Sequence, residues 1–282
     1  MIAKAFAKLN LSLTVDSRRG GLLHGIVGMF QSIDWHDVLD VSKADKDELT
    51  GPAGAQVIDG RDNLAWLALM AVRSHAGSTI PVRLQLDKRL PVAAGLGGGS
   101  ADAAAAMGAA GKMFGVTRDD LRDIGPSLGS DVPFCFVGGR AVVSGTGEEV
   151  LPLPPADGYG LGVVVPPIEI STTAVYQEWD RLNGPSGIEV SGRFLPPTLR
   201  GDGPFANDLY PAAVAIAPGI DDWRSELSHR WSRPVMLTGS GPALFGYFVD
   251  KDEALSAVRD IPLGARSAAA ARPVGSGWEI QA

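Results

Sequence analysis

A cluster of glycines that runs directly into an alanine-rich segment is the part of this chain best suited to chemistry. Residues 91–106 read PVAAGLGGGSADAAAA. Glycine has no Cβ, so the backbone can bend sharply and a ligand can reach the main-chain N–H groups. Alanine favours a helix, which we expect to begin near Ser100. The free N–H groups and the positive dipole end of this helix would face the glycines and form an anion site suited to phosphate.

Three common motifs do not fit these glycines. A Walker loop requires G-x-x-x-x-G-K-[ST], but the Gly-Lys pair at 111–112 is followed by Met113 and lies within or after the expected helix. A Rossmann loop, which would indicate an oxidoreductase, requires a strand directly before the glycines, whereas residues 88–91 intervene here. The G-x-S-x-G pattern of a serine nucleophile is also missing. A plain glycine-rich connector stays open as an alternative on this segment alone.

Four further features could contribute to a site, and each also has a simple structural interpretation. Lys8 lies in an apolar strand-like segment, where it is either a site residue or a solvent-facing lysine of an edge strand. Asp131 precedes an apolar run and could be a helix cap or turn residue. His24 could be an ordinary surface or core histidine. The segment Thr238–Pro242, TGSGP, could be only a tight hairpin.

Composition narrows the classes of function. The chain has 282 residues, a hydrophobic fraction of 45% and a net charge of −7, which argues against a nucleic-acid-binding or polybasic membrane surface. The single cysteine, Cys135, excludes an intrachain disulfide and lies in an apolar run, so we expect a core residue. Lys4 and Lys8 interrupt the N-terminal apolar stretch, unlike a signal peptide. We expect a cytoplasmic protein, monomeric or homodimeric.

The order of the expected elements predicts an α+β fold with two domains, residues 1–155 and 156–282, divided at the proline-rich segment LPLPP. In the first domain we expect strands at 5–15, 25–35, 37–42 and 80–86, a polar loop at 43–60, and helices at 63–75, 100–114 and 117–127. In the second we expect strands at 160–165, 235–237, 243–249 and 275–281, and helices at 171–181, 207–217, 220–229 and 252–260.

The chain resembles the GHMP kinases, which are ATP-dependent kinases of small molecules. Three segments carry this resemblance in the family's order: AKLNLSL near the start, PVAAGLGGGSADAA in the middle and LTGSGPALF near the end. Further segments, among them DNLAW, DKRLP, LGSDVPF and NDLYPAA, resemble the members that phosphorylate an alcohol linked to cytidine diphosphate. The resemblance covers essentially the whole chain.

The resemblance implies an N-terminal domain similar to domain 2 of ribosomal protein S5, a ferredoxin-like C-terminal domain and an active site between them. It also implies that Asp131 and Lys8 are the catalytic pair and that Ser100 could touch Mg²⁺. The residues implied to bind ATP are Asn63, Leu64, Lys88, Pro91, Gly95, Leu96, Gly97, Gly98, Gly99 and Ser100. Those implied to bind the small-molecule acceptor are Asn10, His24, Phe30, Tyr176, Gly239, Ser240 and Gly241.

One segment departs from the family pattern. Where the family has D-G-Y-H, this chain has Gly21-Leu22-Leu23-His24, so leucine replaces the tyrosine implied to contact cytosine. Base stacking prefers an aromatic face. Leu23 therefore motivates an alternative, a GHMP kinase that acts on another small alcohol, although the aromatic side chains implied near the cytidine, Phe30 and Tyr176, could still hold a base. A catalytically silent nucleotide-binding homologue is a third interpretation, although the intact Lys8, Asp131 and glycine segment speak against it.

Overall fold

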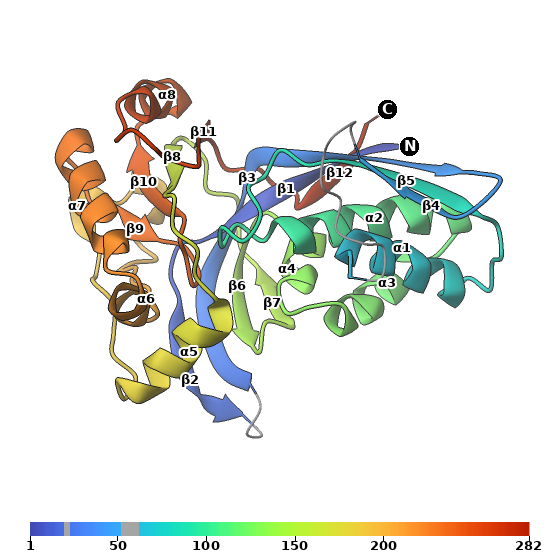
Figure 1. The fold of residues 1–282 in the computed structure, drawn as a ribbon, viewed down its shortest axis with the longest axis horizontal. Helices are drawn as coiled ribbons and strands as arrows, with labels where there is room; N and C mark the ends of the chain where they lie inside the picture. Colours follow the sequence, from blue (N-terminus) through green and yellow to red (C-terminus); the bar gives the residue numbers. More distant parts are fainter. Residues whose placement is uncertain (20–22, 52–61, 282) are drawn as a thin grey trace.

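In the computed structural model, which describes residues 1–19, 23–51 and 62–281, two β-sheets lie side by side and each has its own group of helices (Figure 1). The larger sheet contains eight strands and the smaller sheet contains four. The mixed α/β content expected from the sequence is confirmed. The boundary at residue 155 stays a prediction.

The larger sheet is built almost entirely from antiparallel pairs around the long strand β3. Its central order is β12-β1-β3-β5-β4, while β2 and β6 also pair with β3, and β7 pairs with β6. Only the β4–β5 pair of this sheet is parallel among the described residues. The strands are β1 (Ile2–Asn10), β2 (Thr14–Arg19), β3 (Leu23–Lys43), β4 (Glu48–Thr50), β5 (Val82–Asp87), β6 (Arg140–Gly145), β7 (Glu149–Pro152) and β12 (Trp278–Ile280).

The smaller sheet has the order β11-β8-β10-β9. Its strands are β8 (Gly160–Val165), β9 (Met236–Leu237), β10 (Leu244–Phe248) and β11 (Ser267–Ala271). Four helices accompany the larger sheet: α1 (Leu64–His75), α2 (Gly98–Phe114), α3 (Arg118–Ile124) and α4 (Val132–Val137). Four accompany the smaller sheet: α5 (Thr172–Arg181), α6 (Tyr210–Ile216), α7 (Gly219–Trp231) and α8 (Lys251–Arg259). Short 3₁₀ turns occupy residues 125–127, 192–194 and 197–199.

Several expected boundaries are wrong in an informative way. The expected strand at 5–15 is divided into β1 and β2, which both pair with β3, because a bulge interrupts the pairing where the N–H groups of Leu11 and Ser12 both bond to the carbonyl of Met29. The expected strands at 25–35 and 37–42 form one continuous strand, β3. The loop expected at 43–60 contains β4, and its residues 52–60 lie outside the described residues. Helix α2 begins at Gly98, two residues before Ser100.

The two sheets share apolar side chains. Leu9 of β1 and Leu11, just after this strand, belong to the same buried cluster as Leu161 and Val163 of β8 and Phe245 of β10. All five side chains have no measurable exposure. Burial of this kind stabilises the contact by roughly 1.5–3 kcal/mol for each large apolar side chain. Strand β1 is therefore held firmly between the helices of the larger sheet and the strands of the smaller one.

No helix in the described parts of the chain is long and apolar enough to span a membrane.

The last strand, β12, lies in the larger sheet and pairs with β1, although it follows the smaller sheet in sequence. The described chain thus leaves the larger sheet after β7 and returns to it at its end.

Candidate active site

Two cavities adjoin each other at the glycine loop, residues 95–100. The first, about 580 Å³, is lined by residues of β1, β3, α5 and the turn between β9 and β10. The second, about 520 Å³, is lined by the start of α1, the segment after β5 and the loop itself. Four residues line both cavities: Gly95, Gly97, Ser100 and Thr172. The two cavities therefore meet at this shared wall.

Lys8 and Asp131 form an ion pair in the first cavity. The distance from Lys8 Nζ to Asp131 Oδ2 is 3.2 Å, and the side chains are 5% and 32% exposed respectively. Lys8 also donates to Asn10 Oδ1 at 2.6 Å. Strand β1 has neighbours on both sides, so the alternative of a solvent-facing edge lysine is wrong. Asp131 occupies the N-cap position of α4, but its side chain makes no capping bond. Its carboxylate is thus available to the cavity.

The glycine loop packs directly against the residues of this pair. The N–H of Lys8 donates to the carbonyl of Leu96 at 2.9 Å, and a Cβ at Gly97 would lie 2.8 Å from Lys8 Cγ. Gly97 has a φ of +67°, which favours glycine, and it is the N-cap of α2 without a side-chain capping bond. The first N–H groups of an α-helix have no acceptor within the helix. The start of α2 is therefore a suitable anion site beside Lys8.

The Gly239-Ser240-Gly241 turn, which links β9 and β10, completes the wall from the other sheet. A Cβ at Gly95 would lie 2.8 Å from the carbonyl oxygen of Thr238 and 2.9 Å from that of Gly241. The N–H of Ala243 donates to the carbonyl of Ala94 at 3.1 Å. Residues 238–242 do form a hairpin turn, which was the structural alternative for this segment. The turn also brings the smaller sheet against the glycine loop.

Thr172 and Asn10 extend this contact between the two halves of the molecule. The hydroxyl oxygens of Thr172 and Ser240 are 2.8 Å apart, which joins the start of α5 to the turn. The N–H of Asn10 donates to Thr238 Oγ1 at 2.8 Å. The polar groups of the first cavity are thus fixed by bonds that cross between the two sheets.

Aromatic side chains line the far side of the first cavity. His24 stacks on Tyr176 with ring centroids 4.9 Å apart and meets the edge of Trp179 at 5.6 Å. His24 Nε2 lies 2.7 Å from Asp180 Oδ1. Burial, reinforced by the negative charge of Asp131, raises the pKa of Tyr176 to about 12, so its hydroxyl is neutral at physiological pH. This arrangement offers flat apolar faces with polar edges, as a planar ring system requires.

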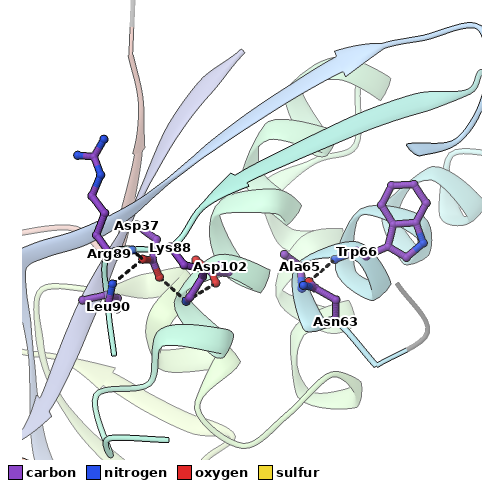
Figure 2. Close-up of polar contacts among 8 residues, drawn as sticks. All are labelled: Asp37, Asn63, Ala65, Trp66, Lys88, Arg89, Leu90 and Asp102. Carbon is purple, nitrogen blue, oxygen red and sulfur yellow. Dashed lines mark hydrogen bonds and ion pairs between the residues drawn. The ribbon is translucent and has the colours of Figure 1, made fainter. Parts of the chain in front are cut away.

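A buried charge cluster supports the second cavity (Figure 2). Lys88 Nζ lies 2.5 Å from Asp37 Oδ2 and 2.8 Å from Asp102 Oδ2. Burial lowers the pKa of Lys88, but the charges of Asp102 and Asp37 outweigh this effect and the net pKa is raised. Burial raises the pKa of Asp102 well above its ordinary value. Lys88 is consequently charged at neutral pH and firmly held beside the loop.

The start of α1 forms the opposite side of the second cavity (Figure 2). Asn63 is the N-cap of α1, and its Oδ1 accepts bonds from the N–H groups of Ala65 and Trp66 at 3.0 and 3.2 Å. Its side-chain oxygen is thus committed to the helix, so the amide N–H groups are what this side chain could offer to a ligand.

The structure brings together nearly all the residues implicated by the sequence. The second cavity is lined by all ten residues proposed to bind ATP: Asn63, Leu64, Lys88, Pro91, Gly95, Leu96, Gly97, Gly98, Gly99 and Ser100. The first is lined by the catalytic pair, Lys8 and Asp131, and by six of the seven residues proposed to bind the acceptor: Asn10, His24, Phe30, Tyr176, Gly239 and Ser240. Gly241 lines neither cavity.

Two buried carboxylates, Asp37 and Asp102, were not expected from the sequence. A signal for Asp37 was present: Leu39 and Val41 lie on the same face of β3 by alternation, and both are fully buried. A lone charge on such a face needs a partner.

Cys135, by contrast, is buried as expected, and burial raises the pKa of its thiol, which makes it unreactive.

The departure from the family pattern is only partly described. Gly21 and Leu22 lie outside the described residues, and Leu23 is the first residue of β3.

Within the described residues, no group of three or more histidine, cysteine, aspartate or glutamate side chains could hold a metal ion.

Comparison with known proteins fits this geometry. Residues 63–139, which contain the glycine loop, match the family of the GHMP kinases N terminal domain. The chain is 37% identical to 4-diphosphocytidyl-2-C-methyl-D-erythritol kinase of Moorella thermoacetica, with 89% of this chain and 90% of that protein covered. It is 34% identical to the kinase of that name from Caldanaerobacter subterraneus subsp. tengcongensis, with 98% of each covered. The chain belongs to the 4-diphosphocytidyl-2-C-methyl-D-erythritol kinase family, within the GHMP kinases.

Solved structures agree with this membership. A crystal structure of 4-(cytidine 5'-diphospho)-2C-methyl-D-erythritol kinase matches with a TM-score of 0.80 and 30% identity, covering 98% of this chain and all of that one. A homoserine kinase from Cytophaga hutchinsonii has a TM-score of 0.70 at 18% identity, over 99% of this chain and 96% of that one, and shares the fold. The chain is thus a small-molecule kinase of the GHMP type, and the GHMP kinases use ATP.

Proposed function

We propose that this protein transfers the γ-phosphoryl group of ATP to the 2-hydroxyl of 4-diphosphocytidyl-2-C-methyl-D-erythritol, a step in non-mevalonate isoprenoid precursor biosynthesis. The observation that carries the proposal is the Lys8–Asp131 ion pair, which lies in the first cavity directly beside the loop shared with the second. Family membership supports the choice of substrates. The second cavity would hold ATP and the first would hold the acceptor.

In this proposal Asp131 is the general base. An alcohol is a poor nucleophile, and a carboxylate within hydrogen-bond reach can take its proton as the bond to phosphorus forms. Lys8, 3.2 Å away, pairs with that carboxylate and would offset the charge that develops on the phosphoryl oxygens. Asn10, which accepts a bond from Lys8, would orient the acceptor.

The glycine loop would hold the phosphates of ATP. The missing side chains at Gly98 and Gly99 leave the N–H groups at the start of α2 accessible, which fits an anionic ligand. Mg²⁺ would neutralise charge on the phosphates, and Ser100 at the shared wall is our candidate ligand. Magnesium is usually bound by substrate phosphates with only one or two carboxylates, so the lack of a metal-binding cluster among the described residues is compatible with it.

We further propose the finer assignments that follow from the family. The part that carries the glycine loop would be similar to domain 2 of ribosomal protein S5, and the part around the smaller sheet would be ferredoxin-like. The net charge of −7 and the single cysteine favour a cytoplasmic enzyme that does not bind nucleic acid, either a monomer or a homodimer.

The proposal is tested by incubating the purified protein with ATP, Mg²⁺ and a panel of alcohols that includes the cytidyl substrate, homoserine and mevalonate. Phosphorus NMR would detect a new phosphomonoester and identify the hydroxyl that carries it. We expect turnover of the cytidyl substrate at its 2-hydroxyl. Turnover of another alcohol alone would favour our second candidate function, which is phosphorylation of a different small alcohol. Leu23 is the observation that motivates it. ATP binding without any turnover would favour a catalytically silent homologue.

A further inference from the structure

The charge cluster of Lys88, Asp37 and Asp102 joins the two ends of the glycine-loop segment. Lys88 precedes the glycine loop, residues 95–100, and Asp102 follows it in α2. Their 2.8 Å ion pair therefore connects the chain on either side of the loop. Asp37, in β3, attaches this pair to the sheet (Figure 2). Its other carboxylate oxygen accepts bonds from the N–H groups of Arg89 and Leu90 at 2.5 and 2.7 Å.

The cluster lies beside the second cavity, so it could affect nucleotide binding as well as the stability of the fold. Lys88 and Asp102 both line the second cavity. Lys88 Nζ lies 3.4 Å from the position that a Cβ on Gly98 would occupy, at the first turn of α2. An ammonium group has three N–H donors, and two of them are taken by the carboxylates. The direction of the third is consequently fixed by Asp37 and Asp102.

The balance of charge argues against a purely electrostatic role. Asp37 is fully buried and Asp102 is 3% exposed, and Asp102 Oδ1 has no hydrogen-bond partner. Two buried carboxylates close to a phosphate site would by themselves repel an anion. Their presence is explained if ATP binding gains more from the fixed positions of Lys88 and the loop than it loses through this repulsion.

We propose that Asp37 and Asp102 are positioning residues for ATP, which act by holding Lys88 and both ends of the glycine loop in place. This inference rests on the proposed function, because it assumes that the second cavity binds ATP. It concerns two residues that make no contact with the acceptor cavity, so it predicts an effect on one substrate only.

The test compares Asp37→Asn and Asp102→Asn with the wild-type protein. Each change keeps the shape of the side chain and replaces its carboxyl group with an amide. If the role were electrostatic, ATP would bind more tightly to both variants; if the residues position Lys88 and the loop, ATP binds more weakly. We expect KM and Kd for ATP to rise about tenfold, with KM for the acceptor and kcat at saturating ATP within about twofold of wild type.

Asp87→Asn is the matched control. Asp87 immediately precedes Lys88, but its side chain is 40% exposed and pairs with Arg89 at the surface, so we expect little change in KM for ATP. A variant that is merely less stable would lose active protein and lower kcat without a selective rise in KM for ATP. If Asp37→Asn fails to fold, Asp102→Asn decides the question alone.

Two results would overturn the inference, and they can be distinguished. Normal ATP binding by the wild-type protein, with unchanged or tighter binding by the variants that fold, contradicts the positioning role alone. Failure of the wild-type protein to bind ATP in calorimetry contradicts the proposed function and removes the basis of the inference with it.

Discussion

Lys8 illustrates how one residue can depend on neighbours from distant parts of the sequence. A lysine this deeply buried needs a partner for its charge, and Asp131 supplies one from the start of α4. The Lys8 ammonium also lies 5.2 Å from the centre of the Phe30 ring, which adds a favourable contact with its face. The position of the ammonium is therefore determined from more than one side.

Asp131→Asn should lower kcat by about 10²–10⁴-fold, because the amide cannot accept the proton of the acceptor hydroxyl. Kd for ATP should change little, since Asp131 does not line the second cavity. Steady-state kinetics and calorimetry would measure the two quantities separately. Asp119→Asn is a suitable control because that side chain is 90% exposed. Near-normal turnover by Asp131→Asn would contradict its role as the base.

Leu23→Tyr should lower KM for the cytidyl substrate if the acceptor cavity binds a base. The family pattern has a tyrosine at this position, and an aromatic ring favours base stacking. Competition with CMP, measured by calorimetry, would report on the base alone. A weaker affinity for both compounds would indicate that the cavity takes a different acceptor.

At the scale of single residues, the sequence predicts positions better than partners. The glycine segment and the resemblance around Lys8 and Asp131 predicted residues that line two adjoining cavities. Asp37 and Asp102 escaped notice because each looks unremarkable locally, one in a strand and one in an alanine run. Their significance depends on Lys88 lying between them, which only the folded chain brings about.

Helix α2 connects the glycine loop to the interior, and its small residues allow neighbouring elements to approach closely. Every residue from Ala101 to Gly111 is buried. Gly108 faces Trp278 of β12, whose ring would lie 2.3 Å from an added Cβ. Trp278 stacks on Phe136 and donates to its carbonyl at 3.0 Å, so the ring cannot move aside freely. The composition of α2 thus reflects packing as much as helix propensity.

Gly108→Ala should destabilise the protein by about 1–3 kcal/mol, although alanine is the better helix former. Thermal and urea unfolding would measure the change. Gly201→Ala is the control, because no heavy atom outside its chain neighbours lies within 4 Å of its added Cβ. Equal or greater stability of Gly108→Ala would show that Trp278 adjusts without cost.

At the scale of elements, local pattern predicts most helices well, and long-range pairing explains the exceptions. Asn63 caps α1 and Thr117 caps α3, at the starts that the sequence indicates. Residues 267–271 read SAAAA, a composition that favours helix, yet they form β11 because β8 offers a complete set of backbone partners. Such pairing between distant segments cannot be derived from the local sequence.

The path of the whole chain makes its last strand part of the larger sheet. β12 pairs with Ala3, Lys4 and Ala5 of β1, and the N–H of Phe6 donates to the carbonyl of Gly277 at 2.9 Å. Because β1 also carries Lys8 and Asn10, the end of the chain supports the strand on which the candidate site depends. Stability and activity are accordingly linked through β1.

Removal of residues 277–282 should lower the stability of the whole molecule by about 3–5 kcal/mol, mainly through loss of Trp278. For a protein of this size Tm should fall by roughly 5–15 °C. Calorimetric unfolding would measure the shift, and removal of Ala282 alone is the control. A truncated protein with the Tm of the full chain would show that β12 contributes little to the larger sheet.

The shared wall of Gly95, Gly97, Ser100 and Thr172 has a consequence for inhibitor design. A single compound with a nucleoside-like part in one cavity and an alcohol-like part in the other would cross this wall by a short linker. Once its first part has bound, its second part is present at a high effective concentration, so the two affinities reinforce each other. If the first cavity takes the acceptor, as we propose, such a bisubstrate ligand would discriminate this kinase from relatives that share the fold but not the acceptor.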